Sequence, residues 1–230
     1  MPHHSPEEIK VRYLENMGDG LGLQFNELWQ DVARLHVKWH EFVELFGTKS
    51  TRVDLLNQAA PTFFRIVQDT LWEDIVLHIA RLTDPPKSNS RTANLSIRNL
   101  PDLVSGDDVK AKVEELVRVI KDKSEFCRDW RNRRIAHTDL ALAIDDSAPR
   151  LLAASRLHVR EALTAIVEAL NEVARAHGDS STHFDMPVGA GGALSLLYVI
   201  RDGLNAATAR KERLKRREWT PDDLSQDREI

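Results

Sequence analysis

Apolar residues recur at steps of three and four positions through several long segments of this chain. The most regular segment is 155–176, and the same spacing runs through 21–46, 53–82, 109–131 and a closing segment that starts at Ala193. The stripe within 155–176 consists of Val159, Leu163, Ile166, Val167, Leu170 and Val173. Such spacing places apolar side chains on one face of a helix, whereas a half-buried strand alternates apolar and polar residues. We therefore predict an all-α protein, a bundle of long antiparallel helices.

Glycine and proline residues predict where these helices end. Gly47 and Gly178 each follow a periodic segment, and glycine commonly terminates a helix. Pro61 lies inside 53–82, where its missing amide hydrogen and its ring disfavour a continuous helix. We therefore expect the helix to kink or to restart at Pro61.

Polar segments between the periodic ones are predicted to connect the helices. Residues 83–94 contain two prolines and a polar cluster, which suit an exposed loop, and a short helix is expected at 95–104. Asp107 and Asp108 are expected to cap the next helix, because free amide groups at a helix start need acceptors. Residues 178–192 are predicted to form a long loop.

Length, charge and cysteine content restrict the class of protein. The 230 residues, of which 42% are hydrophobic, are expected to form one domain over 1–230, with flexible ends at 1–18 and 218–230. The net charge of −4 excludes a global positive field, so any nucleic-acid site has to be local. The single cysteine, Cys127, excludes an intrachain disulfide, and we expect it to pack as a small apolar residue. No apolar signal region or membrane-spanning run is found, so we expect a cytoplasmic protein with no membrane partner.

The sequence RNRRIAH at 131–137 places three arginines and a histidine at the end of an apolar helix face. On a straight helix Arg131 lies within about 20° of Ile120, Arg134 within about 40° and His137 at about 100°. Buried arginines need partners, so this face has to open onto a cleft, an interface or solvent. Because Arg131 and His137 are poorly aligned, either the helix bends or ends near Ile135, or a second copy of the chain supplies the complementary group.

A purely structural interpretation of this cluster has to be considered first. Arginines near the carboxyl end of a helix interact favourably with the helix dipole, and a histidine there can cap the last turn. From residue spacing alone, this interpretation is the more common one.

The same residues resemble the arginine, polar residue, four-residue spacer and histidine motif of the HEPN superfamily. Its members are helical-bundle proteins of prokaryotic defence and toxin–antitoxin systems, and many are metal-independent ribonucleases. Together with LWEDIVLHIARLTD at 71–84 and the closing helix, the motif is similar to the abortive-infection branch, which confers phage resistance. The resemblance implies a HEPN-like bundle that forms a two-fold homodimer with the motifs at a shared cleft, and it implies no metal or cofactor.

The resemblance also implies roles for individual residues. Arg131 is the motif arginine and would hold the scissile phosphate, Asn132 is the polar residue that would orient its neighbours, and His137 would be the general acid or base. This set suits RNA cleavage, because histidine titrates near neutral pH and arginine pairs with phosphate oxygens. Arg128 and Arg134 would add RNA contacts.

The segment 71–84 supplies further candidates that would support the motif, namely Glu73, His78 and Arg81. His78 lies on the broad apolar face of its helix, where a histidine is most often a hydrogen-bonded core residue. Arg81 and Asp84 are three positions apart near the helix end and could pair.

Other charged or motif-like segments are weaker candidates. His36 and His40 have the spacing of metal ligands, but the required glutamate and a third ligand are missing, so we interpret them as surface or partly packed residues. The basic run at 210–217 is interpreted as a solvated helix end, with an RNA contact as the alternative. The GAGG segment at 189–192 lacks the lysine and strand context of a phosphate-binding loop.

Two functions from different classes follow from the sequence. The first is a metal-independent endoribonuclease of a phage-defence or toxin–antitoxin system, with RNA as substrate. The second is a non-catalytic helical module of a defence system that binds RNA or a protein, since a motif does not guarantee chemistry. The expected partners are RNA and a second copy of the chain, and an antitoxin protein or a role as regulator within a defence operon stays open.

Overall fold

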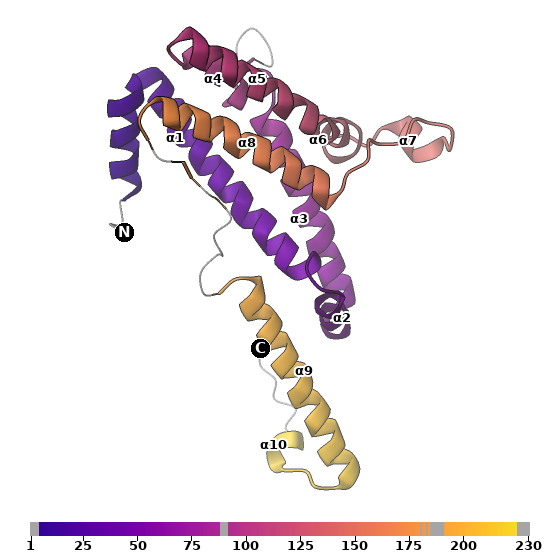
Figure 1. Ribbon diagram of the computed structural model, residues 1–230. Coiled ribbons are helices and arrows are strands. Elements are labelled where there is room, and N and C mark those ends of the chain that lie inside the picture. Colours follow the sequence, from indigo (N-terminus) through magenta and orange to yellow (C-terminus); the bar gives the residue numbers. More distant parts are fainter. Residues whose placement is uncertain (1–4, 88–91, 180, 183, 185–190, 225–230) are drawn as a thin grey trace. The chain divides into compact units, whose positions relative to one another are not determined.

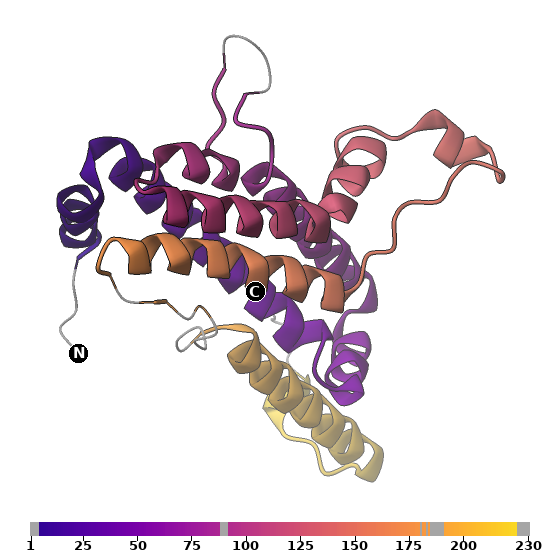
Figure 2. The ribbon, with the colours of Figure 1, turned by 45° about the horizontal axis from the view of Figure 1, so that its top comes forward.

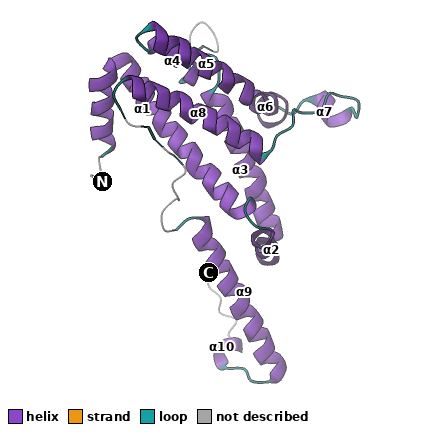
Figure 3. Cartoon of the chain, viewed as in Figure 1, coloured by secondary structure: helices purple, strands orange, loops and turns teal. Residues whose placement is uncertain are grey.

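The computed structural model describes residues 5–87, 92–179, 181–182, 184 and 191–224 (Figure 1). These residues form helices joined by loops, as the colouring by secondary structure shows (Figure 3). The exception within the described residues is an isolated antiparallel bridge between Lys87 and Ala93. The all-α prediction is therefore confirmed.

The chain divides into two compact units, and the single domain over 1–230 stays a prediction. The first unit comprises Met1–His40 and Thr70–Pro187, and the second comprises Glu41–Asp69 and Val188–Ile230. Both units are discontinuous in sequence, because the second is formed from a middle segment and the closing segment. Hydrophobic periodicity shows which face of a helix is buried, but it does not show which buried faces share one core.

Helix α1, Pro6–Phe46, begins much earlier than the predicted start at residue 21. Its helical geometry is interrupted at Gly18, which has a φ of 74° and a ψ of 166°, a backbone conformation that glycine adopts readily. The segment before this break packs back on the helix: Tyr13 is buried edge-on against Phe25, with ring centroids 4.9 Å apart. Tyr13 therefore anchors this segment to the rest of α1, and the flexibility of 1–18 stays a prediction.

Helix α3, Pro61–Leu82, starts at the proline, as predicted. It follows α2, Ser50–Ala59, and the two are separated by Ala60, whose φ of −159° and ψ of 76° are not helical. After α3 the chain forms a loop and then η1, Ile97–Asn99, and α4, Leu100–Leu103, which confirms the short helix expected at 95–104.

Helices α5, Asp107–Lys123, and α8, Arg156–Ala176, lie side by side in the first unit (Figures 1 and 2). Ser155 caps α8 by accepting a hydrogen bond from the His158 amide at 3.3 Å. The predicted stripe of α8 is buried except for Val167, which is half-buried.

The start of α5 differs from the prediction. Gly106 is its N-cap and has a φ of 90°, and no side chain caps the first amides. Asp107 and Asp108 instead occupy the first turn of the helix. A carboxylate in the first turn is stabilised by the positive end of the helix dipole. The acidic pair therefore stabilises the start of α5 without a capping hydrogen bond.

The second unit has an apolar core of its own around α2 and α9, Ala193–Arg216. Its buried members are Leu45, Leu56, Phe64, Ala193 and Leu197. The basic end of α9 is tied to α10, Pro221–Leu224, where Asp223 accepts hydrogen bonds from Arg213 and Thr220. These contacts keep the pKa of Asp223 well below its usual range. α10 is thus bonded to the end of α9 through Asp223, the flexibility of 218–230 stays a prediction, and 225–230 lie outside the described residues.

No helix of the described residues combines the length and the apolar character that crossing a membrane requires.

Candidate functional site

The arginine and histidine cluster at 131–137 lies where a helix changes its geometry. α5 ends at Lys123, the short α6, Glu125–Trp130, follows, and the next turn, Arg131–Ile135, is a π-helix labelled η2. In this turn the Ala136 amide donates to the Arg131 carbonyl oxygen five residues earlier, at 2.8 Å. The helix therefore ends near Ile135, which was one of the alternatives that the sequence left open.

The π turn corrects the orientation predicted for Arg134. A wider turn adds a residue to the hydrogen-bonded ring, so directions calculated at 100° per residue no longer apply after it begins. The Arg131 side chain is 22% exposed and faces the end of α3, whereas the Arg134 side chain is 55% exposed. One inward arginine is therefore found where two were predicted.

Arg131 is held by an acidic and a polar residue. Its Nη1 donates to Asp84 Oδ1 at 2.5 Å and to Oδ2 at 2.6 Å. Its Nε donates to Asn132 Oδ1 at 3.0 Å. The Asp84 side chain is 20% exposed, so this ion pair is shielded from water on most sides. Three donor contacts fix the plane and the direction of the guanidinium group.

Arg131, through this ion pair, and a second arginine both contact the carboxyl end of α3. Arg128, on α6, donates from Nη2 to the Thr83 carbonyl oxygen at 3.0 Å. Arginine is favoured at such a helix end because the last carbonyl groups lack partners within the helix. Arg128 is only half-buried, but this hydrogen bond links α6 to the end of α3.

Arg134 stacks on an aromatic side chain at the surface. Its guanidinium carbon lies 5.4 Å from the centre of the Trp130 ring, and its Nε lies 3.6 Å from Glu73 Oε1 on α3. Trp130 also meets Trp72 in an edge-to-face arrangement, with centroids 6.4 Å apart. An exposed cation next to a π face suits a contact with a phosphate or a base.

Arg133 ties the segment that follows the π turn to the bundle. Its Nε donates to Asp139 Oδ2 at 3.1 Å, and its Nη1 lies 3.5 Å from Asp129 Oδ1. The hydrogen bond with Asp139 raises the pKa of Arg133 and lowers that of Asp139. Asp139 in turn caps α7, Leu140–Ile144, by accepting from the amides of Ala141 and Leu142. The Arg133 side chain therefore has a structural role.

His137 is exposed two residues after the π turn, and it has no hydrogen-bond or ion-pair partner within the described part of the chain. A groove of about 360 Å³ lies along the same segment, between the end of the π turn and α7. It is lined by Glu73, Arg133, Arg134, Thr138, Asp139, Leu142 and Ala143. The end of the cluster thus combines an open groove, an accessible arginine and an accessible histidine.

Comparison with known protein families matches residues 18–190 to HEPN_AbiU2, described as AbiU2. The chain belongs to this HEPN family. The resemblance predicted from RNRRIAH is thereby confirmed, and the family is one associated with abortive infection. The match contains both 71–84 and 131–137 and ends before α9, so it does not include the closing helix. No curated protein and no solved structure matches the chain.

Of the three supporting residues proposed for the HEPN motif, Glu73 alone contacts the 131–137 segment, through Arg134. Arg81 is exposed and has no side-chain partner among the described residues. The pair of Arg81 and Asp84 that their spacing allows does not form, because the Asp84 carboxylate binds Arg131.

His78 is a core residue, as its position on the apolar face predicts. It is 2% exposed, and its Nε2 lies 3.1 Å from Asp31 Oδ2 on α1. Burial lowers the pKa of His78, and the neighbouring Asp31 carboxylate offsets part of this effect. His78 therefore joins α3 to α1 inside the bundle of this AbiU2 HEPN protein and does not contact the motif through any described interaction.

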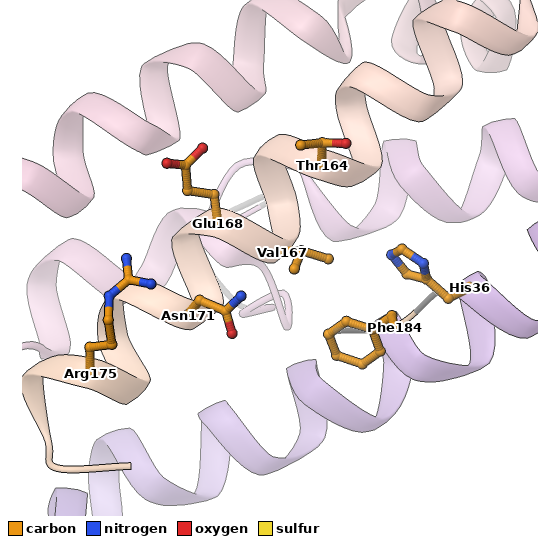
Figure 4. A pocket seen from close by; sticks show the side chains of 7 residues that line it. All are labelled: His36, Thr164, Val167, Glu168, Asn171, Arg175 and Phe184. Atoms are coloured by element: carbon orange, nitrogen blue, oxygen red, sulfur yellow. The ribbon is translucent and has the colours of Figure 1, made fainter. Parts of the chain in front are cut away.

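His36 lies at a second pocket, on the α1 and α8 side of the first unit (Figure 4). Its ring stacks on Phe184 with centroids 5.0 Å apart, and the pocket has a volume of about 260 Å³. Asn171 in this pocket is already bonded to the backbone of Thr182 through both its oxygen and its nitrogen. Within the described residues, no group of three or more histidine, cysteine or acidic side chains is placed to hold a metal ion.

Cys127 is buried on the apolar face of α6, as predicted, and burial raises the pKa of its thiol. The contact of Asp84 with Arg131 is the part of the site that the sequence did not predict. Asp84 lies two residues after the end of α3 and precedes two prolines, which marks a helix end where an arginine can bind. Nothing local in the sequence identifies Arg131 as that arginine.

Proposed function

We propose that this AbiU2 HEPN protein is a metal-independent endoribonuclease of a prokaryotic phage-defence or toxin–antitoxin system. The observation that carries the proposal is the HEPN motif at the end of a π turn, where Arg131 is fixed by two neighbours and His137 is accessible. Cleavage of RNA without a metal requires at least a cation that is fixed in place and an acid or base group that the substrate can reach.

In the proposed reaction His137 removes the proton from a ribose 2′-hydroxyl group. The 2′-oxygen attacks the adjacent phosphorus, the bond to the 5′-oxygen breaks, and that oxygen takes up a proton from water. The products are a 2′,3′-cyclic phosphate and a free 5′-hydroxyl group. Arg131 stabilises the additional negative charge on the phosphate oxygens, and Asn132 keeps the arginine side chain in place through its contact with Nε.

The other arginines have different proposed roles. Arg134 is exposed and stacks on Trp130, so it is available to contact the RNA backbone or a base. Arg128 donates to the end of α3, so its proposed contribution to RNA binding is electrostatic and indirect.

The test compares purified wild-type protein with His137→Ala on total RNA and transfer RNA in the presence of a chelator. We expect wild-type fragments that end in 2′,3′-cyclic phosphate and no fragments from His137→Ala. Circular dichroism should be identical for both proteins, because His137 has no partner to lose in the part of the chain that the structure describes. Cleavage that disappears with the chelator would contradict the metal-independent reaction. RNA bound but not cleaved by either protein would support the non-catalytic module instead.

We further propose that two copies pair through the face of α7 and bring two motifs into one cleft. Leu140 and Ile144 lie one turn apart on α7 and are 71% and 75% exposed. In Figures 1 and 2 this helix stands away from α5 and α8 of the same unit. Apolar side chains exposed to this degree and close to a site are typical of a surface that another chain covers.

The double substitution Leu140→Glu and Ile144→Glu is expected to weaken the dimer by about tenfold or more, because carboxylates are costly to bury without partners. Sedimentation velocity over a range of concentrations measures the change. The matched control is Leu23→Glu with Val37→Glu on α1, which adds the same charge at residues 44% and 46% exposed. Equal dimer dissociation constants for the two double variants would reject the α7 interface.

A further inference from the structure

The contacts of Arg131 leave one edge of its guanidinium group free. A guanidinium has five N–H donors. Nη1 donates to both Asp84 oxygens, and Nε donates to Asn132 Oδ1. The two hydrogens of Nη2 have no partner among the described residues. A phosphate can therefore be bound through Nη2 while the three existing contacts are kept.

Asp84 is itself held in place by its backbone. The hydroxyl group of Ser96, a fully buried side chain, donates to the Asp84 carbonyl oxygen at 2.6 Å. The Asp84 amide donates to the Arg81 carbonyl oxygen at 3.3 Å. Asn94 closes the loop that follows, because its side chain donates to the Pro85 carbonyl oxygen at 2.8 Å. A carboxylate on a backbone fixed at these points can define the position of another side chain.

The Asp84 carboxylate links two parts of the chain that are 47 positions apart in sequence. Without it, the Nη1 end of a largely enclosed arginine would lose its acceptors, and the side chain would have to turn toward water. Asn132 alone would then hold Arg131, through the single contact at Nε. One contact does not fix the direction of a long, flexible side chain.

We infer that Asp84 is a positioning residue, which orients Arg131 so that Nη2 is presented to the scissile phosphate. The inference rests on the proposed ribonuclease function and adds a residue that lies outside the HEPN motif. A different role would follow if Asp84 masked Arg131 by competing with phosphate. The two roles predict opposite results, because removing a mask strengthens RNA binding and removing a support slows the chemical step.

The test measures kcat and KM for Asp84→Asn and Asp84→Ala beside wild type and His137→Ala. We expect Asp84→Ala to lower kcat by about 10- to 100-fold with less than about a threefold change in KM, as misplacement of a reacting group does. Asp84→Asn keeps the shape and one acceptor oxygen, so it should fold and lose less. The control is Glu115→Gln, which removes a carboxylate from an exposed ion pair with Arg118 and should leave both constants unchanged.

Other outcomes separate this inference from the proposed function. If wild type cleaves RNA and both Asp84 variants have the wild-type kcat, the positioning role is overturned but the proposed function stands. A lower KM of the Asp84 variants at constant kcat would have the same consequence. If wild type and His137→Ala are equally inactive, the proposed function fails. The Nε–Hε signal of Arg131 in ¹⁵N NMR spectra then tests whether Asp84 positions Arg131. That signal should shift in Asp84→Ala, and an unchanged signal would show that Asp84 does not position Arg131.

Discussion

Arg131→Ala is expected to lower the rate of RNA cleavage by about 100-fold or more. In the proposed mechanism this side chain is the cation nearest to the developing charge, and losing one preorganised donor at such a position typically costs 10²- to 10³-fold in kcat. The substitution also leaves the Asp84 carboxylate without its partner at a position that is 20% exposed. We nevertheless expect Arg131→Ala to fold, because the ion pair lies at the end of α3 and not within the apolar core.

Arg134→Ala is the matched control, since it removes the same chemical group three positions later. Its ion pair with Glu73 spans 3.6 Å and its side chain is 55% exposed, so the loss should affect RNA affinity and salt dependence more than the rate at saturation. Cleavage rates at saturating RNA and circular dichroism spectra are measured for both variants. If Arg131→Ala cleaves as fast as Arg134→Ala, Arg131 is not the catalytic cation.

Most helix positions in this protein follow from local sequence. The stripe of α8, the restart of α3 at Pro61 and the start of α9 at Ala193 are all found where the residue pattern predicts them. These features depend on neighbours within one or two turns. The helix before Gly18 was not predicted, because Gly18, Gly20 and Gly22 lie close together and such a glycine-rich stretch is more typical of a turn or loop.

The arrangement of the site was only partly predictable, for a related reason. Arg131 and His137 are identified by their spacing, and their family is confirmed. The π turn at Arg131–Ile135 follows α6, whose Arg128 binds the end of α3, and no local sequence pattern predicts that contact. The spacing of Asp84 allows a pair with Arg81 three positions away, but the tertiary contact with Arg131 is the one that forms.

The largest effect on stability is expected for Leu163→Ala in α8. Leu163 is 2% exposed and lies on the stripe of α8, the helix that packs beside α5. Removing the three outer carbons of a buried leucine costs about 2–5 kcal/mol, because the apolar contacts are lost and the cavity closes only in part. Urea denaturation should show this decrease in the free energy of unfolding of the first unit. Tryptophan fluorescence can follow that transition, because Trp29, Trp72 and Trp130 all belong to this unit.

The control for this variant is Leu157→Ala, which removes the same atoms from the same helix at a residue 49% exposed. Its free energy of unfolding should change by less than about 1 kcal/mol. Below the melting temperature of Leu163→Ala, cleavage per folded molecule should stay at the wild-type level, because Leu163 makes no contact with Arg131, Asn132 or Asp84 among the described interactions. A loss of activity in folded Leu163→Ala would show instead that α8 packing sets the geometry of the site through α5 and α6. Arg131→Ala and Leu163→Ala therefore form a reciprocal pair, in which one variant should lose activity with little loss of stability and the other should lose stability with little loss of activity.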